Sequence, residues 1–241
     1  MKLYTIGSST KGACYVITSQ NEALILEAGI LPDHLWKAVN FDLKKVSGCL
    51  ISHPSNETCS FAREYAEDLN VYSSAETIRF LNIAHFERVK AIKAGETYQI
   101  GDFLVKPFEL KHSVKNFGYF INHAETGRII YLTHTSNIPY VFNGVNHLIL
   151  ECNYLTSKLT KNLKNEEIRP ILSRQIINNR MSFETVKSWL SRIDLSDLKN
   201  ILLCNVSEKN GAPELFKDEI TLQTKINTNI AVSGLTIDLK F

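Results

Sequence analysis

The sequence predicts an α/β fold in which two β-sheets stack as a sandwich flanked by helices. Short apolar runs bounded by turn residues recur in both halves of the chain, and segments with helical spacing lie between and after them. A chain of 241 residues, 44% of them hydrophobic, can bury the core of one such layered domain. We therefore expect a single domain over residues 1–241.

The N-terminal half begins with three apolar runs at residues 3–6, 14–18 and 23–27. Short turn-rich links separate them, so we expect antiparallel neighbours in one sheet. The same patterns predict further strands at residues 48–52 and 71–72, and helices at residues 32–39, 61–69 and 75–81.

From residue 89 onward the alternation of strands and helices continues. Apolar runs predict strands at residues 89–92, 103–110, 117–122, 129–133, 147–151 and 200–204, and a hairpin-like pair at residues 230–239. Helical spacing covers residues 155–179, 181–192 and 213–224. Ser182 is a suitable residue to cap the second of these helices.

Charge and cysteine content limit the classes of function. A formal net charge of +2 argues against a protein that holds nucleic acid through charge alone. No apolar run is long enough to span a bilayer. The cysteines are odd in number, form no C-x-x-C pair and suit a reducing compartment. We therefore expect a cytoplasmic protein without a membrane partner. The cysteines are Cys14, Cys49, Cys59, Cys152 and Cys204.

Three histidines stand where predicted strands end: His53, His112 and His134. If those strand ends meet at one edge of a sheet, the imidazoles could bind zinc or a similar metal. Each also has a structural interpretation, because His53 could cap the following helix and the other two could be hydrogen-bonded core residues. The remaining histidines are interpreted as structural: His34, His85, His123 and His147.

Ordered sequence blocks run along nearly the whole chain. Residues 7–15 read GSSTKGACY and residues 26–29 read LEAG. Later blocks are IPY at residues 138–140, ECNY at 151–154, MSFET at 181–185 and SEKN at 207–210. Together they resemble the single-domain metallo-β-lactamase-fold hydrolases of bacteria and phages, a group that includes phosphodiesterases and nuclease-like proteins. The resemblance implies an αββα sandwich of two mixed sheets and a phage or prophage setting.

Most metal-binding positions of that family carry other residues here. The family signature T-H-x-H-x-D-H aligns with SHPSNET at residues 52–58, which keeps only the first histidine. The aligned positions are His53, Ser55, Glu57 and Thr58 in this loop, His112 for a later histidine, His134 for the bridging aspartate, Arg180 and Asn205 for two further histidines, and Glu27 for a supporting aspartate.

These replacements alter the chemistry that the resemblance implies. Family members use two metal ions to activate a bridging water. The metal position that would use Glu57, Thr58 and Asn205 keeps at most one good ligand. We therefore expect no two-metal centre. We expect a non-catalytic binding or regulatory protein without a cofactor. Its ligand-binding cleft would comprise His53, Ser55, Glu57, Thr58, His112, His134, Arg180 and Asn205.

Two other functions stay open. One is a single-zinc hydrolase that acts on a phosphodiester, such as a cyclic nucleotide or nucleic acid, through His53, His112 and His134. In that case Glu57 and His134 are the catalytic candidates. The other is a structural subunit whose surface, and not its cleft, carries the function. The resemblance also implies a homodimer, and a nucleotide or a protein is the expected partner.

Overall fold

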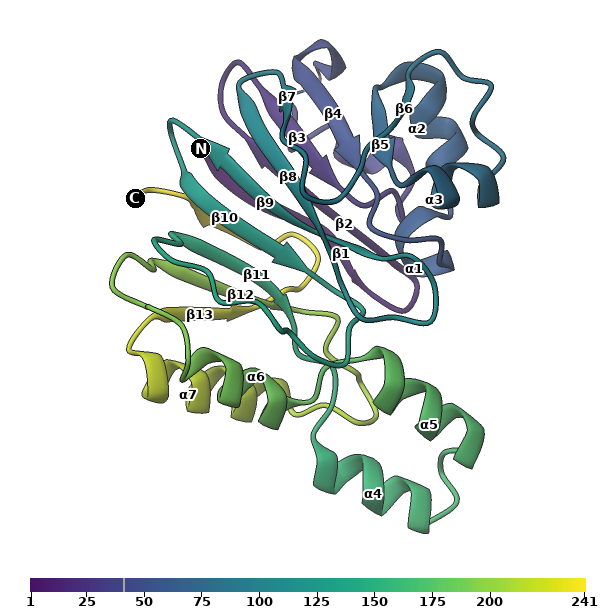
Figure 1. The fold of residues 1–241 in the computed structure, drawn as a ribbon. Helices are drawn as coiled ribbons and strands as arrows, with labels where there is room; N and C mark the ends of the chain where they lie inside the picture. Colours follow the sequence, from purple (N-terminus) through teal and green to yellow (C-terminus); the bar gives the residue numbers. More distant parts are fainter. Residues whose placement is uncertain (41) are drawn as a thin grey trace.

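The computed structural model describes residues 1–40 and 42–241. Within these residues two seven-stranded sheets face each other, and helices lie on the outer face of each (Figure 1). This arrangement confirms the fold class predicted from the sequence. No helix of the described residues is long and apolar enough to cross a membrane.

The first sheet is formed mainly by the N-terminal part of the chain. Its strands run in the order β14-β1-β2-β3-β4-β5-β6. The strands β14, β1, β2 and β3 pair antiparallel, whereas β3 to β6 pair parallel. The bounds are β1 Lys2–Ser9, β2 Gly12–Thr18, β3 Ala23–Leu26, β4 Val46–Leu50, β5 Val71–Ser73, β6 Val89–Ala91 and β14 Thr236–Asp238.

The second sheet has the same mixed character. Its order is β13-β12-β11-β10-β9-β8-β7, with β7 to β10 antiparallel and β10 to β13 parallel. The bounds are β7 Tyr98–Ile100, β8 Phe103–Glu109, β9 Phe117–His123, β10 Gly127–Leu132, β11 His147–Glu151, β12 Asn200–Cys204 and β13 Asn227–Ile230.

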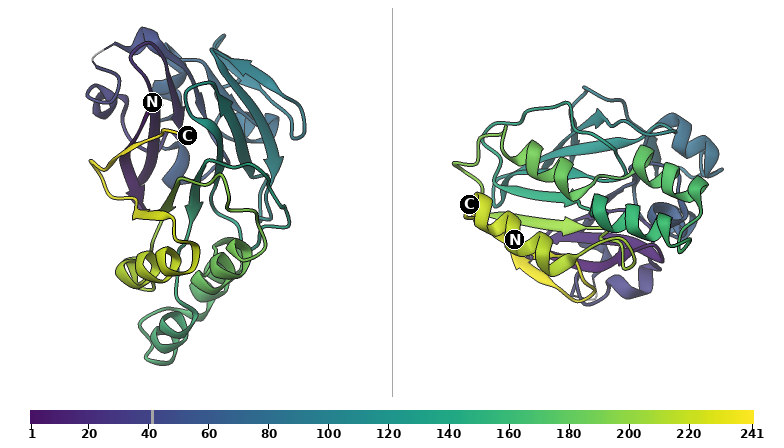
Figure 2. Two further views of the ribbon diagram at one scale, coloured as in Figure 1. Left: turned by 90° about the vertical axis from the view of Figure 1, so that its left-hand side faces the viewer. Right: turned by 90° about the horizontal axis from the view of Figure 1, so that it is seen from below.

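Helices cover the sandwich on both sides and extend it at one end (Figures 1 and 2). The first sheet packs against α1 Asn56–Cys59, α2 Ala62–Asp68 and α3 Ala75–Phe80. The second packs against α6 Phe183–Leu190 and α7 Pro213–Thr224. The helices α4 Thr156–Lys164 and α5 Pro170–Asn179 project from the body (Figure 2), and short 3₁₀ helices span Pro32–Leu35 and Leu43–Lys45.

Apolar side chains fill three layers: one between the sheets and one under each set of helices. The layer between the sheets contains Tyr15, Tyr119 and Tyr131, all fully buried. Burying three phenols requires a partner for each hydroxyl. Tyr15 donates to the hydroxyl of Ser8, Tyr119 to the carbonyl of Ile51 and Tyr131 to the carboxyl of Glu27.

Three element predictions were wrong in detail. Residues 230–239 form no hairpin, because β13 belongs to the second sheet and β14 to the first. The helical region 155–179 divides into α4 and α5, with Pro170 opening the second helix. Residues 32–39 form a 3₁₀ helix only as far as Leu35.

Candidate functional site

The structure brings the three strand-end histidines together. His53 follows β4, His112 follows β8 and His134 follows β10, and one ring nitrogen of each lies within 4.8 Å of the other two. The ring centroid of His53 is 4.9 Å from that of His112 and 4.4 Å from that of His134. Strands that are remote in sequence thus build one imidazole cluster.

His53 presents a nitrogen with no protein partner. Its ring is fully buried, and its Nδ1 lies 2.9 Å from the hydroxyl of Ser52. Its Nε2 is buried and has no hydrogen-bond partner among the described residues. Burial, followed by the neighbouring His134 and His112, holds the pKa of His53 well below 6.5. The ring is therefore neutral near pH 7, which is the form that binds metals.

His112 is half-buried, and the backbone N–H of Val114 donates to its Nδ1 over 3.3 Å. Burial lowers its pKa, and the charge of Arg180 lowers it further. The same two causes hold the pKa of the buried His134 well below 6.5. All three rings of the cluster are therefore neutral near pH 7.

His134 is also engaged by a cation from the protein itself. Its Nε2 lies 2.7 Å from Nη1 of Arg180 and 3.1 Å from Oε2 of Glu57. A guanidinium can only donate, so a neutral His134 accepts the Arg180 N–H through Nε2. Nε2 of His134 therefore already has a hydrogen-bond donor, whereas Nε2 of His53 has no partner among the described residues.

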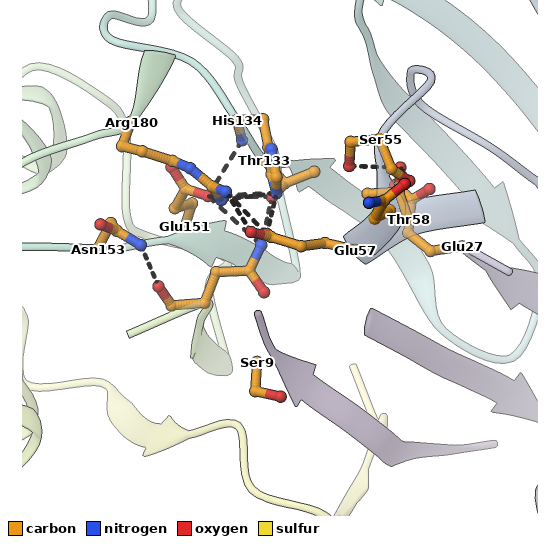
Figure 3. Close-up of polar contacts among 12 residues, drawn as sticks. Ser9, Glu27, Ser55, Glu57, Thr58, Thr133, His134, Glu151, Asn153 and Arg180 are labelled. Atoms are coloured by element: carbon orange, nitrogen blue, oxygen red, sulfur yellow. Dashed lines mark hydrogen bonds and ion pairs between the residues drawn. The ribbon is translucent and has the colours of Figure 1, made fainter. Parts of the chain in front are cut away.

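Arg180 stands at the centre of an ion cluster (Figure 3). Its Nη2 donates to both carboxylate oxygens of Glu57, over 2.7 and 2.8 Å, and its Nη1 donates to Glu151 over 3.1 Å. Only 17% of the Arg180 side chain is exposed. Burial alone lowers the pKa of Arg180, but the charges of Glu151 and Glu57 outweigh it and raise that pKa. The guanidinium therefore stays charged.

Glu151 is the site residue that sequence reasoning missed. It ends β11, is fully buried, and accepts bonds from five groups: Thr133 Oγ1, His134 N, Arg180 Nη1, Met181 N and Asn205 Nδ2. Burial raises its pKa, while Arg180 acts in the opposite direction. An acidic residue at the end of an apolar strand was the available signal, and it was used only as part of the ECNY block.

Glu27 lies on the first-sheet side of the site. It accepts the backbone N–H of Ser52 over 3.1 Å and the hydroxyl of Tyr131 over 2.8 Å. Because the carboxyl is fully buried, its pKa is raised to about 7. Glu27 thus joins the loop that carries His53 to the second sheet.

Backbone strain is concentrated at these strand ends. Glu27, His134 and Asn205 have φ values of 69°, 52° and 52°. This left-handed region is uncommon for residues other than glycine, and such strain persists where surrounding contacts impose it. Nearby, Gly29 lies so close to the carbonyl of Glu57 that an added Cβ would overlap it. The loop carrying Glu57 is therefore seated tightly against residues 27–29.

The other replaced positions serve the local structure. The hydroxyl of Thr58 donates to the carbonyl of His53 over 2.8 Å and lies 3.1 Å from the hydroxyl of Ser55. The amide of Asn205 donates to Thr133 over 2.8 Å, and its Oδ1 is buried without a partner among the described residues. Ser55 and Thr58 form hydrogen bonds within their own loop, whereas Asn205 binds Thr133, the residue before His134.

Comparison with known proteins identifies the fold. No family model and no curated protein matches this chain. Solved structures do: YhfI of Bacillus subtilis, a metallo-β-lactamase-fold protein, has a TM-score of 0.71 at 15% identity, covering 98% of this chain and 99% of that one. The chain has the metallo-β-lactamase fold. Zn²⁺-bound PqqB of Methylobacterium extorquens has a TM-score of 0.72 at 12% identity, covering 99% and 100%. A diphosphatase of the PhnP family has a TM-score of 0.67 at 14% identity, covering 100% of this chain and 98% of that one.

A metallo-β-lactamase fold raises the question of whether these residues suit a metal. Zinc holds nitrogen ligands at about 2.0–2.1 Å, so tetrahedral ligands lie roughly 3.4 Å apart. The cluster nitrogens lie within 4.8 Å of one another, so they would have to move closer together to bind one ion. The buried, unpartnered Nε2 of His53 is an atom that a metal would satisfy. The donor set therefore favours one zinc-type ion over the absence of a cofactor.

A second group with metal-binding side chains has a different explanation. Ligand atoms of Glu22, Asp102 and His123 also lie within 4.8 Å of one another. Here Glu22 pairs with His123 over 3.4 Å and accepts the hydroxyl of Ser47 and the backbone N–H of Asp102. These contacts join the turn before β3 to β4, β9 and the turn before β8, so we interpret the group as structural.

Proposed function

We propose that this protein is a one-metal hydrolase of phosphodiester type. The observation that carries the proposal is the convergence of His53, His112 and His134, with Nε2 of His53 buried and unpartnered. The tRNase Z and diphosphatase names among its structural neighbours support a phosphate-containing substrate. The zinc-bound neighbour PqqB supports zinc as the ion.

Each side chain has a separable task in this proposal. His53, His112 and His134 would hold the ion, and Ser52 fixes the ring of His53 through Nδ1. When bound, such an ion acts as a Lewis acid and lowers the pKa of a water molecule. Arg180 supplies positive charge beside the cluster, where a phosphate would lie. His134 must release Arg180 if it is to coordinate through Nε2.

A second candidate is a non-catalytic protein whose cleft binds a phosphodiester ligand or a partner. The observation in its favour is the double bond from Arg180 to Glu57. Glu57 is 17% exposed, and both of its oxygens are occupied by the guanidinium. A carboxylate held in this way is a poor general base. On this view the protein binds its ligand and catalyses no reaction.

Metal content and turnover test the first proposal together. Protein purified without chelators should contain close to one zinc per chain and hydrolyse bis(p-nitrophenyl) phosphate slowly. His112→Ala should lose most of the metal and the activity, because two imidazoles hold zinc far less well than three. His85→Ala, at an exposed position outside the cluster, is the matched control. Wild-type protein without bound metal would exclude the one-metal hydrolase.

The same samples separate the two candidates. If wild type binds a cyclic dinucleotide or single-stranded nucleic acid but turns over neither, and His112→Ala binds equally well, the non-catalytic function is supported. If binding and turnover disappear together in His112→Ala, the hydrolase is supported. The homodimer, the partner, the phage or prophage setting and the cytoplasmic location stay predictions.

A further inference from the structure

Arg180 contacts side chains of the kinds that bind metal ions. Glu57 offers a carboxylate and His134 offers an imidazole. In the structure the guanidinium lies among them and also contacts the buried Glu151. The cation therefore comes from the chain itself.

The hydrogen bonds of the guanidinium explain how this charged group can be buried. Its Nη1 contacts His134 over 2.7 Å and Glu151 over 3.1 Å, and its Nη2 contacts both oxygens of Glu57. These contacts pair one cation with two carboxylates. A buried carboxylate such as Glu151 needs a compensating charge close by. Arg180 supplies it, as a divalent ion could.

We propose that Arg180 is an internal cation that takes the place of a second metal ion and excludes it from the half-site formed by Glu57, Glu151 and His134. An added ion would meet a fixed positive charge, and it would find both oxygens of Glu57 and Nε2 of His134 already bound. Removing the guanidinium frees these three atoms. The inference concerns the half-site beside Arg180. This half-site shares His134 with the histidine cluster, so its test is made in a parent that lacks His112.

The test is a gain of metal binding, measured without reference to activity. Arg180→Ala, which removes the guanidinium and adds no ligand, and Arg180→Lys are each made in a His112→Ala parent, which lacks the complete histidine cluster. Bound Zn²⁺ is counted by elemental analysis after dialysis, and thermal unfolding is followed with EDTA and with Zn²⁺. Arg180→Ala should gain about one ion per chain over the parent, and zinc should stabilise it against unfolding. Arg180→Lys keeps the charge, so it should gain none.

Each result decides the proposal. If folded Arg180→Ala gains no ion, or if Arg180→Lys gains as much, Arg180 does not exclude a metal. If Arg180→Ala is unfolded in EDTA and zinc restores it, the proposal is supported, because zinc then replaces the missing charge. If it stays unfolded at every zinc concentration, the proposal is wrong. The wild-type metal count tests the histidine cluster separately, so either proposal can fail alone.

Discussion

At the scale of single residues, Glu27 shows how this site couples charge to stability. Its carboxyl is fully buried at the end of β3, with Ser52 N–H and Tyr131 O–H as donors. Burial outweighs these two donors and raises its pKa from 4.5 to about 7. Ionisation of Glu27 is therefore easier in the unfolded chain than in the folded one.

Glu27→Gln should flatten the dependence of stability on pH. A raised folded-state pKa contributes stability that is present below pH 4.5 and lost as pH rises through about 7. Between pH 5 and pH 8 the wild type should lose roughly 2–3 kcal/mol that Glu27→Gln retains. Urea unfolding at both pH values measures the difference.

The control for this prediction is Glu208→Gln, which changes an exposed acid outside the site. It should keep the wild-type slope of unfolding free energy against pH. An equal slope in Glu27→Gln and wild type would mean that Glu27 is already ionised in the folded protein at pH 5.

At the scale of elements, the start of α6 fixes the backbone that carries Arg180. Ser182 caps the helix by accepting the N–H of Thr185. Just before it, the N–H of Met181 donates to Glu151 over 3.2 Å. The segment that leads from α5 to α6 is thus held at both of its last two residues, which limits where the Arg180 side chain can reach.

Ser182→Ala should reduce the free energy of unfolding by about 1 kcal/mol, because one helix N–H loses its partner. Hydrogen exchange should speed up at Thr185 and Met181. Ser74→Ala, which removes the corresponding cap of α3 from Thr77, is the matched control. It should cost a similar amount while leaving exchange in α6 unchanged. Equal exchange in both variants would show that the cap does not hold this segment.

Single elements were predictable from local pattern, and their partners were not. The bounds of β11, β12 and α7 follow directly from apolar runs and from Pro213, and the Ser182 cap was predicted. Residues 230–239 read as a hairpin because two short apolar runs lie close together. Alternation shows that a strand is half-buried but not which strand it pairs with. The partner of β14 is β1, at the other end of the chain.

The same reasoning explains what the sequence indicated about the site. Strand-end positions and the family resemblance brought His53, His112 and His134 forward as candidates. The role of Arg180 could not be read from pattern, because its partner Glu57 is 123 residues away. Glu151 was overlooked for the same reason. Its donors Thr133, Met181 and Asn205 lie after β10, before α6 and after β12, and only the fold brings these segments together.

At the scale of the whole molecule, polar bonds fasten the two sheets together beside the site. Tyr131 of β10 donates to Glu27 over 2.8 Å, and Tyr119 of β9 donates to the carbonyl of Ile51 over 2.7 Å. Both tyrosines are fully buried between the sheets. The stacking of the sandwich and the placement of the His53 loop are therefore parts of one arrangement.

Tyr131→Phe tests that coupling through its dependence on pH. The substitution leaves Oε1 of Glu27 buried without its donor, and a lost partner of this kind costs about 1–3 kcal/mol. The Tyr131 hydroxyl favours the ionised carboxyl, so its removal raises the pKa of Glu27 further. The loss of unfolding free energy should consequently be larger at pH 8 than at pH 5. Tyr119→Phe removes a bond to a backbone carbonyl that does not titrate, so its cost should be the same at both pH values. If the two variants show the same pH dependence, Tyr131 does not control the charge of Glu27.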